Sequence, residues 1–275
     1  MKNTLYPITD DHIHLDPVNG RGIEAARDFK RAGGTHLFLV NKPAGLSGTP
    51  PRIPQDYLAV FDATLQIACA CREIGLVVFP ILGVHPAELS RLAETMPLPD
   101  AVSLMKGGLD LAAGYVREGT AFALKSGRPH YEVPQPVWNA SNDVLHHALS
   151  LGARCGCAVQ IHAESGPCTD VVDIARNAGM DPGQVVKHYG TAGTPLVPSL
   201  IANNSDIPDL CRTGRGFMME SDFMDENSRP GAVTGPKSVP RFTQRLLAEG
   251  SITEDDVCRI HTETPAKVYH VEISL

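Results

Sequence analysis

The sequence lacks the long apolar run that a membrane-spanning helix needs. Its longest apolar stretch, residues 74–84, has 11 residues and includes Pro80, whereas a helix needs about 20 residues to cross a bilayer. The N-terminal segment MKNTLYPITDDHIH also lacks the apolar core of a secretion signal. These absences predict a cytoplasmic protein with no membrane partner.

Paired cysteines and an excess of basic charge are missing as well. The cysteines stand at positions 69, 71, 155, 157, 168, 211 and 258, without the C-x2-C pairs typical of zinc ribbons. We expect them to be reduced, mostly buried thiols. The 24 Lys and Arg residues against 31 Asp and Glu give a net charge of -7. This balance argues against a broad surface for nucleic-acid phosphates but leaves room for a local basic groove.

What the sequence does contain is an alternation of short aliphatic runs and longer amphipathic stretches, which is typical of βα units around a parallel sheet. Strands are predicted at residues 6–15, 35–41, 76–85, 121–125, 157–162, 184–189, 196–202 and 217–222. Helices are predicted at residues 22–32, 56–74, 98–118, 136–154 and 240–249. Eight strands in 275 residues predict an α/β protein with a single domain, residues 1–275, folded as a (β/α)8 TIM barrel.

Polar residues gather where the predicted strands end. His12 and His14 are two residues apart on the first strand, so their side chains point to the same face. His162, His188 and Asp222 end the fifth, sixth and eighth strands, each after an apolar run. In a TIM barrel the carboxyl ends of the strands meet at one mouth, so all five side chains are expected to converge there.

A single histidine at a strand end is more often a hydrogen-bonded structural residue than a metal ligand. Five such residues at one mouth instead favour metal ligation, because imidazole nitrogens and carboxylate oxygens suit Zn, Mn, Fe or Ni. We expect one to two divalent metal ions per chain, with zinc as the first choice.

The order of these residues resembles the TatD-like metal-dependent hydrolases of the amidohydrolase superfamily. The likeness consists of H-x-H on the first strand, G-x-H-P at residues 83–86, and the later His, His and Asp in that order. Further stretches resemble the archaeal branch of the family: residues 127–131 (GRPHY), 186–189 (VKHY), 220–223 (ESDF), 229–231 (RPG), 235–237 (GPK) and 239–240 (VP). The resemblance covers essentially the whole chain, and the ordered set is far more specific than H-x-H alone.

This resemblance implies a role for each residue of the set. His12, His14 and Asp222 would hold one metal ion, and His162 and His188 would hold a second. A hydroxide that bridges the two ions would be the nucleophile, and Asp222 would be the catalytic residue that orients or deprotonates the water from which this hydroxide forms. The positions where the family has substrate-binding groups are occupied by His85, Arg128 and His130. For His85, a plain loop role is an equal alternative.

One residue departs from the family pattern. The TatD pattern has a metal-bridging Glu on the fourth strand, two residues before the glycine of GRPH, and this sequence has Lys125 there. Strand alternation puts Lys125 on the same face as Ala121 and Ala123, toward the mouth, with Phe122 and Leu124 on the other face. Barrels that resemble phosphotriesterases and dihydroorotases carboxylate such a lysine, which turns a cation into a bridging anion, and we favour this for Lys125. The alternative is a one-metal site in which Lys125 replaces the second charge.

Three functions are compatible with the sequence. The first is a hydrolase of an ester, amide or phosphoester bond in a small molecule. The second is a TatD-like deoxyribonuclease or phosphodiesterase, supported by the basic residues Arg229, Lys237, Arg241 and Arg245 after the last strand. The third is a non-catalytic metal-binding barrel, which the complete ligand set disfavours. We expect the first, with a small-molecule substrate ahead of nucleic acid. The sequence specifies neither the substrate nor the oligomeric state.

Overall fold

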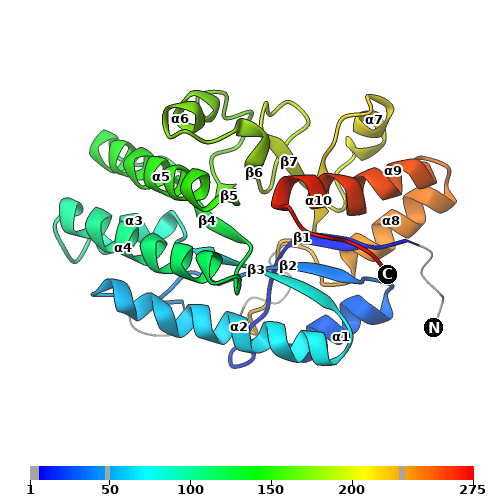
Figure 1. Ribbon diagram of the computed structural model, residues 1–275, viewed down its shortest axis with the longest axis horizontal. Helices are drawn as coiled ribbons and strands as arrows, with labels where there is room; N and C mark the ends of the chain where they lie inside the picture. Colours follow the sequence, from blue (N-terminus) through cyan, green and yellow to red (C-terminus); the bar gives the residue numbers. More distant parts are fainter. Residues whose placement is uncertain (1–5, 47–49, 229–232) are drawn as a thin grey trace.

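The computed structural model describes residues 6–46, 50–228 and 233–275 of the chain. Its centre is a curled sheet of parallel strands with the helices packed around it (Figure 1). The strands are β1 (Thr9–His14), β2 (His36–Val40), β3 (Val77–Gly83), β4 (Ala123–Gly127), β5 (Ala158–His162), β6 (Val185–Lys187), β7 (Val197–Ile201), β8 (Met218–Glu220) and β9 (Phe223–Met224). Their order across the sheet is β8-β7-β6-β5-β4-β3-β2-β1-β9.

The chain itself brings the two ends of this sheet together. β8 and β9 are the end strands of the sheet, yet only Ser221 and Asp222 separate them in sequence. The N–H of Asp222 donates to the carbonyl of His12 on β1 at 2.9 Å, which ties this junction to β1. The α/β class expected from the sequence is therefore confirmed, and the curled all-parallel sheet is consistent with the TIM-barrel type.

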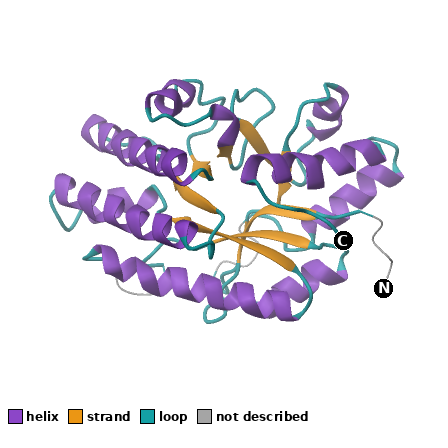
Figure 2. Cartoon of the chain, viewed as in Figure 1, coloured by secondary structure: helices purple, strands orange, loops and turns teal. Residues whose placement is uncertain are grey.

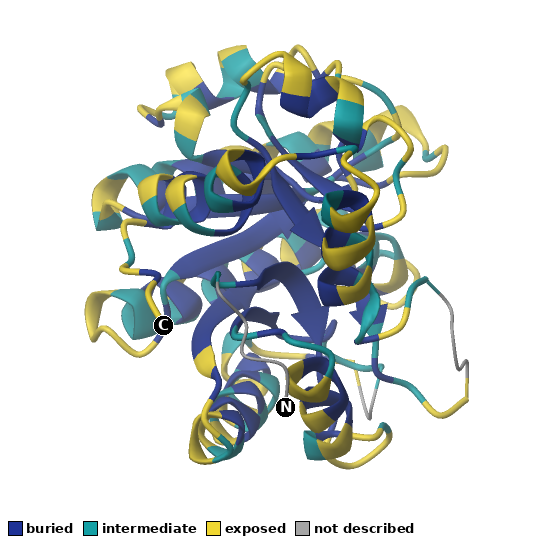
Figure 3. Cartoon of the chain, turned by 90° about the vertical axis from the view of Figure 1, so that its right-hand side faces the viewer, coloured by how far each residue is buried: buried dark blue, intermediate teal, exposed yellow. Residues whose placement is uncertain are grey.

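The helices form an outer layer around the strands (Figure 2). Within the described ranges they are α1 (Ile23–Arg31), α2 (Leu58–Glu73), α3 (Ala87–Leu92), α4 (Leu98–Arg117), α5 (Gln135–Cys155), α6 (Val171–Asn177), α7 (Ile207–Arg212), α8 (Ser238–Ala248), α9 (Glu254–Cys258) and α10 (Thr264–Tyr269). Figure 3 shows buried strands in the centre and exposed residues on the outer faces of the helices. The longest helix, α5, ends where Gly156 adopts a left-handed conformation that favours glycine.

An apolar cluster fills the inside of the curl. It contains residues from β2 to β6 and from β8, among them Phe38, Phe79, Val186 and Met218. Tyr269 of α10 completes it and stacks on Phe38 with 4.1 Å between the ring centroids. Side chains from strands so far apart in the sheet contact one another only across its interior. The polar residues at the carboxyl ends of the strands therefore lie above a packed apolar floor.

Each predicted strand overlaps an observed one, but the eighth is interrupted. β8 ends at Glu220 because Asp222 adopts a positive φ of 44°, which breaks the strand before β9. The five predicted helices are present, whereas α3, α6, α7, α9 and α10 were not predicted. These helices have five to seven residues, which is too short for a helical period to show in the sequence.

Two further features of the structure agree with the sequence analysis: the lengths of the helices and the burial of the cysteines. In the part of the chain that the structure describes, no helix is long and apolar enough to cross a membrane. All the cysteines are free, and Cys71, Cys157, Cys168 and Cys211 are buried, so the prediction of mostly buried thiols is confirmed.

Candidate metal centre

An irregularity in β1 positions the first two histidines. The register of β1 against β2 shifts between Asp10 and Ile13. Within this shift the buried Asp10 carboxyl group accepts from the N–H groups of His12 (3.3 Å) and Ser221 (2.9 Å). One side chain thus joins β1 to the β8–β9 junction, and Asp222 Oδ1 lies 3.7 Å from His12 Nε2.

Gln160 on β5 determines the tautomer of His12, that is, which of its two ring nitrogens carries the proton. The fully buried Gln160 amide NH2 donates to the carbonyl of Asp11 (2.7 Å) and to Tyr269 Oη (3.0 Å). Its Oε1 is therefore the atom that faces His12 Nδ1 at 2.5 Å. Because an amide oxygen only accepts, His12 Nδ1 carries the proton, and His12 Nε2 keeps a free lone pair.

His14 is the same tautomer as His12. Its Nδ1 faces the carbonyl oxygen of Val40 at 2.8 Å, so this nitrogen carries the proton and His14 Nε2 is unprotonated. The two unprotonated Nε2 atoms of His12 and His14 lie 3.0 Å apart with no proton to share. Burial lowers the pKa of His14 to about 3 and that of His12 well below its usual value. A cation coordinated by both nitrogens would remove the repulsion between their lone pairs.

His188 contributes a third unprotonated nitrogen just after β6. Glu220 Oε1 accepts from the Tyr189 N–H (2.8 Å) and from His188 Nδ1 (3.0 Å), which leaves His188 Nε2 without a proton. The His188 ring stacks on the His12 ring with 3.9 Å between centroids. Glu220 is fully buried, and burial raises its pKa well above the usual value.

These side chains form a donor set that fits a divalent transition metal. One ligand atom each from His12, His188 and Asp222 lies within 4.8 Å of the other two, and His14 Nε2 is next to His12 Nε2. Neutral imidazole nitrogens together with a carboxylate oxygen are preferred by zinc and its neighbours. Each Nδ1 is held by an acceptor, which is the outer hydrogen bond that fixes the tautomer and ring orientation of metal-bound histidines.

His162, His85 and His130 form a second group beside the first. His162 Nδ1 lies 3.0 Å from His188 Nε2, and His162 Nε2 lies 2.7 Å from His130 Nδ1. The ring centroid of His85, in the loop after β3, is 4.7 Å from that of His162. His85 Nδ1 accepts the Ala87 N–H at 3.2 Å, so His85 Nε2 carries the proton and is a donor.

Lys125 also lies within this site. Its side chain is buried, and its Nζ has no hydrogen-bond partner among the described residues. Burial lowers the pKa of Lys125, while the nearby carboxyl groups of Asp222 and Glu220 act in the opposite direction. Burial likewise raises the pKa of Asp222. The β3 and β4 backbones are very close here, since a Cβ on Gly83 would lie 1.9 Å from the Lys125 carbonyl oxygen.

The expected strand alternation around Lys125 holds only in part. Ala123 belongs to the inner apolar cluster and Leu124 to an outer one, as predicted. Ala121 and Phe122 precede β4, and their expected orientations are wrong. Ala121 packs in the outer cluster, while Phe122 packs against the inner one because the alternation begins only at the first paired residue of the strand.

The substrate-binding role expected for Arg128 needs correction. Its guanidinium is 1% exposed. Nε and Nη2 donate to the Glu164 carboxylate, Nη1 and Nη2 donate to Asp170, and Nη1 also donates to Asn142. All five N–H donors of an arginine are thereby used within the protein. Arg128 joins the loops after β4 and β5 and has no donor left for a substrate.

Two of the four basic residues after β8 lie beside acidic partners. Lys237 Nζ lies 3.5 Å from Asp28 of α1, and Arg245 lies 3.7 Å from Glu249. Arg241 is exposed on α8. Arg229 and the stretch 229–231 lie outside the described residues. The charges of Lys237 and Arg245 are thus offset within the protein.

Sequence reasoning missed Gln160, Glu220 and Asp10. Gln160 and Glu220 are polar residues two positions before His162 and Asp222, so the i, i+2 spacing that identified His12 and His14 was also present here. Asp10 stands two residues before His12. What the spacing alone does not reveal is that each of these residues hydrogen-bonds a site residue or its neighbour.

Comparison with known proteins gives matches along almost the whole chain. A family model described as TatD-related DNase matches residues 9–205, a range that contains all the site histidines and Lys125. An uncharacterized protein of Methanocaldococcus jannaschii is 33% identical over 98% of both chains.

Solved structures show the same fold at low identity. A TatD-like protein from Archaeoglobus fulgidus aligns over 96% of this chain and 100% of its own, with 17% identity and a TM-score of 0.61. A TatD homologue from Escherichia coli aligns over 96% and 98%, with 15% identity and a TM-score of 0.64. A mutant of a phosphotriesterase-like lactonase from Deinococcus radiodurans aligns over 96% and 95%, with 14% identity and a TM-score of 0.62.

Proposed function

Because this chain belongs to the family of TatD-related DNases, and because its histidines meet with free lone pairs beside a carboxylate, we propose that it is a metal-dependent hydrolase. The resemblance noted in the sequence is confirmed by the family match. One observation carries the proposal: the unprotonated Nε2 atoms of His12 and His14 lie 3.0 Å apart, and ligand atoms of His12, His188 and Asp222 lie within 4.8 Å of one another. A bound divalent ion lowers the pKa of its water toward neutrality and polarises the bond to be cleaved.

The ligand assignment follows the grouping of the side chains. His12, His14 and Asp222 would hold one ion, and His162 would hold a second together with His188, whose ring contacts both groups. One to two ions per chain are proposed, with zinc first and Mn, Ni or Fe as alternatives. We infer that the curled sheet works as a single-domain (β/α)8 TIM barrel with this centre at its mouth.

The chain's own residues supply proton transfer and orientation. Asp222 has a pKa raised by burial, which suits a general base that accepts a proton from the attacking water near neutral pH. His85 presents an Nε2–H that donates to the carbonyl or phosphoryl oxygen of the substrate. His130, which contacts His162, stays a proposed substrate-binding residue.

Lys125 is proposed to be carboxylated at Nζ. The lone pair of the neutral amine attacks the carbon of CO2, an N–C bond forms, and one N–H proton leaves to water, so that a cation becomes an anion. The lowered pKa of Lys125 supports this step, because only the neutral amine reacts. Its Nζ without a hydrogen-bond partner, buried beside several histidines, supports an anion in this place.

The proposed substrate is a small molecule with an ester, amide or phosphoester bond. The alternative is a deoxyribonuclease or phosphodiesterase, as the family description suggests. The net charge of -7 and the internal pairing of Lys237 and Arg245 disfavour a nucleic-acid substrate. Cleavage of single-stranded oligonucleotides that weakens steeply with salt would reverse this ranking.

The test compares metal content and hydrolysis in matched variants. The double variant His12→Ala with His14→Ala should lose most of the bound metal and the hydrolysis of a panel of esters, amides and phosphoesters. His146→Ala, an exposed histidine on α5, serves as the matched control and should keep both. Unchanged metal content in the folded double variant would contradict the proposal.

A further inference from the structure

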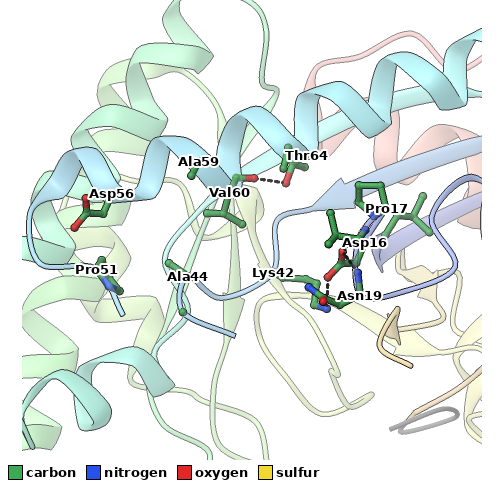
Figure 4. A pocket seen from close by; sticks show the side chains of 14 residues that line it. Asp16, Pro17, Asn19, Lys42, Ala44, Pro51, Asp56, Ala59, Val60 and Thr64 are labelled. Carbon is green, nitrogen blue, oxygen red and sulfur yellow. Dashed lines mark hydrogen bonds and ion pairs between the residues drawn. The ribbon is translucent and has the colours of Figure 1, made fainter. Parts of the chain in front are cut away.

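A pocket of about 350 Å³ is lined by residues that follow His14 on β1 and Val40 on β2, and it has no part in the chemistry described above. It is formed by residues 15–19 after β1, by residues 42–45 and 51 after β2, and by the first half of α2 (Figure 4). Leu15 and Asp16 directly follow His14, and Lys42 stands two residues after Val40, whose carbonyl holds the His14 ring. The walls of the pocket therefore continue the same two strands that position His14.

The loop after β1 is anchored to the end of the sheet. The Asp225 carboxylate, just after β9, accepts the backbone N–H groups of Asp16 (2.9 Å), Arg21 (2.7 Å) and Gly22 (2.7 Å). Three hydrogen bonds to one charged group hold this loop in place. The pocket is therefore formed without a ligand, as small-molecule sites usually are.

Most of the pocket wall is apolar and made of small side chains. Ala59, Val60 and Ala63 line it from α2, and Leu15, Pro17 and Ala44 line it from the two loops. Val18 stands at its edge with 82% of its surface exposed. A volume near the lower end of small-molecule sites suits one aliphatic or aromatic substituent rather than a whole nucleotide strand.

The polar part of the pocket is the buried ion pair of Lys42 and Asp16, in which one N–H of the Lys42 ammonium group has no acceptor among the described residues. Lys42 Nζ donates to Asp16 Oδ2 (2.8 Å) and to the Asp225 carbonyl (3.0 Å). An ammonium group has three donors, so the third finds no acceptor among the described residues. Asp16 already compensates the charge of Lys42, and the exposed Asp56 adds a negative charge to the wall. A neutral acceptor fits here, whereas an anion would be repelled.

We propose that this pocket binds the apolar substituent of a neutral ester or amide substrate, with an uncharged oxygen of that substrate accepting from Lys42. The inference rests on the proposed hydrolase function and narrows its substrate class. Uncharged molecules with a short aliphatic or aromatic group are favoured over phosphodiesters and other anions, because charge and volume both select against the latter.

The first test measures binding without hydrolysis, so that it does not depend on the proposed reaction. Methyl ketones have a neutral carbonyl acceptor and no bond that a hydrolase cleaves. Titration of the purified protein with 2-butanone, 2-pentanone and 2-hexanone, followed by NMR, should show affinity rising by about fourfold per added methylene. Hexanoate, an anion of similar length, should bind at least about tenfold more weakly than 2-hexanone.

Variants on α2 locate the binding in the pocket. Ala63→Phe and Ala59→Phe place a ring in the space and should weaken 2-hexanone binding by about tenfold or more. Gln66→Phe adds the same ring at an exposed position of α2 outside the pocket lining, and it should leave binding within about twofold. Ala59 is itself exposed, so this variant keeps the test valid if Ala63→Phe does not fold. Binding that is unchanged in both folded pocket variants, or equal for 2-hexanone and hexanoate, would overturn the proposal.

A kinetic comparison separates failure of the pocket assignment from failure of the proposed function. The ratio of kcat/KM for phenyl hexanoate to that for phenyl acetate should fall about tenfold in Ala63→Phe and stay constant in Gln66→Phe. An unchanged ratio in an active Ala63→Phe enzyme refutes the pocket assignment and leaves the hydrolase function standing. Ketone binding that depends on the pocket, without hydrolysis of any ester, amide or phosphoester, refutes the hydrolase function and supports the pocket as a site for neutral apolar groups.

Discussion

The two histidine groups of the site differ in what holds their rings. In the first group, His12, His14 and His188, every Nδ1 faces a buried oxygen atom: an amide oxygen, a backbone carbonyl and a carboxyl oxygen. In the second group, His85, His130 and His162, the rings contact one another or a backbone N–H. His130 is exposed, whereas all members of the first group are buried.

This difference separates a preorganised site from an adaptable one. A ring whose Nδ1 proton is fixed presents its Nε2 lone pair in one direction, so metal binding costs little reorganisation. His162 is held by two other imidazole rings, those of His130 and His188, so its orientation follows theirs. We therefore expect one tightly held ion at the first group and a weaker one at the second.

The largest expected effect comes from breaking the first group. His12→Ala should lower the affinity for the tight ion by more than about 100-fold, beyond the loss expected for an outer partner. His162→Ala should remove only the weaker ion and leave about one equivalent. His188→Ala tests to which ion His188 belongs, because its ligand atom clusters with those of His12 and Asp222. Loss of the tight ion in this variant would assign His188 to the first ion, and loss of the weaker ion alone would assign it to the second. Equal metal loss in His12→Ala and His162→Ala, measured by elemental analysis after dialysis, would contradict the comparison.

Lys125 lies at the border between the groups and tests whether the second ion needs an added anion. Reconstitution of metal-free protein should be faster and reach two equivalents when bicarbonate is added. Lys125→Ala should stop near one equivalent. Lys125→Glu should restore two, because it supplies the anion without CO2. A wild-type protein that stops near one equivalent both with and without bicarbonate would refute carboxylation and leave Lys125 as the replacement charge of a one-metal site.

A smaller effect is expected from the partner of His12. Gln160→Leu removes the acceptor of the Nδ1 proton and should weaken metal affinity about 10-fold to 100-fold. Gln160→Glu keeps an acceptor oxygen and should retain more of the affinity than Gln160→Leu, which a loss caused by altered packing alone would not show. Competition with a chelator measures both variants. Similar losses in the two folded variants would mean that the packing of residue 160, and not its hydrogen bond, is what matters.

The sequence predicted those parts of the site that depend on spacing along one strand. Alternation on β1 placed His12 and His14 together, and the strand-end positions of His162, His188 and Asp222 located the mouth. The pairing of Gln160 with His12 and of Glu220 with His188 joins residues 148 and 32 positions apart. Such contacts depend on strand order and curl, which no local period contains.

Motif resemblance also located residues without showing their partners. Arg128 stands in the expected GRPHY stretch, but Glu164 and Asp170 come from the loop after β5 and consume its donors. The pocket beside Lys42 was missed for the same reason, since it is formed by two loops and a helix whose apposition is set by the fold. Residue types in loops carry no period from which that apposition can be read.

The last expected effect is on folding stability rather than on metal binding, and it concerns the support beneath the second group. Glu88 of α3 is buried, its N–H donates to the His85 carbonyl, and its Oε2 accepts from Tyr57 Oη. Burial raises the pKa of Glu88 from 4.5 to about 8, so the folded protein keeps a proton that the unfolded chain loses above pH 4.5. Wild-type stability should therefore fall as pH rises from about 4.5 to 8, by at most about 1.4 kcal/mol per pH unit from this group.

Replacing Glu88 by a neutral isostere removes this pH dependence. Glu88→Gln should match the wild type within about 1 kcal/mol at pH 5 and become progressively more stable than the wild type toward pH 8, because the wild type alone must bury a charge or bind a proton. Urea unfolding at several pH values, analysed as the difference between the two proteins, cancels the contributions of all other groups. The exposed Glu132→Gln on the same side of the site is the control and should give a flat difference. A flat difference for Glu88→Gln as well would mean that the second group rests on a charged support, and its adaptability would then have to come from the histidines alone.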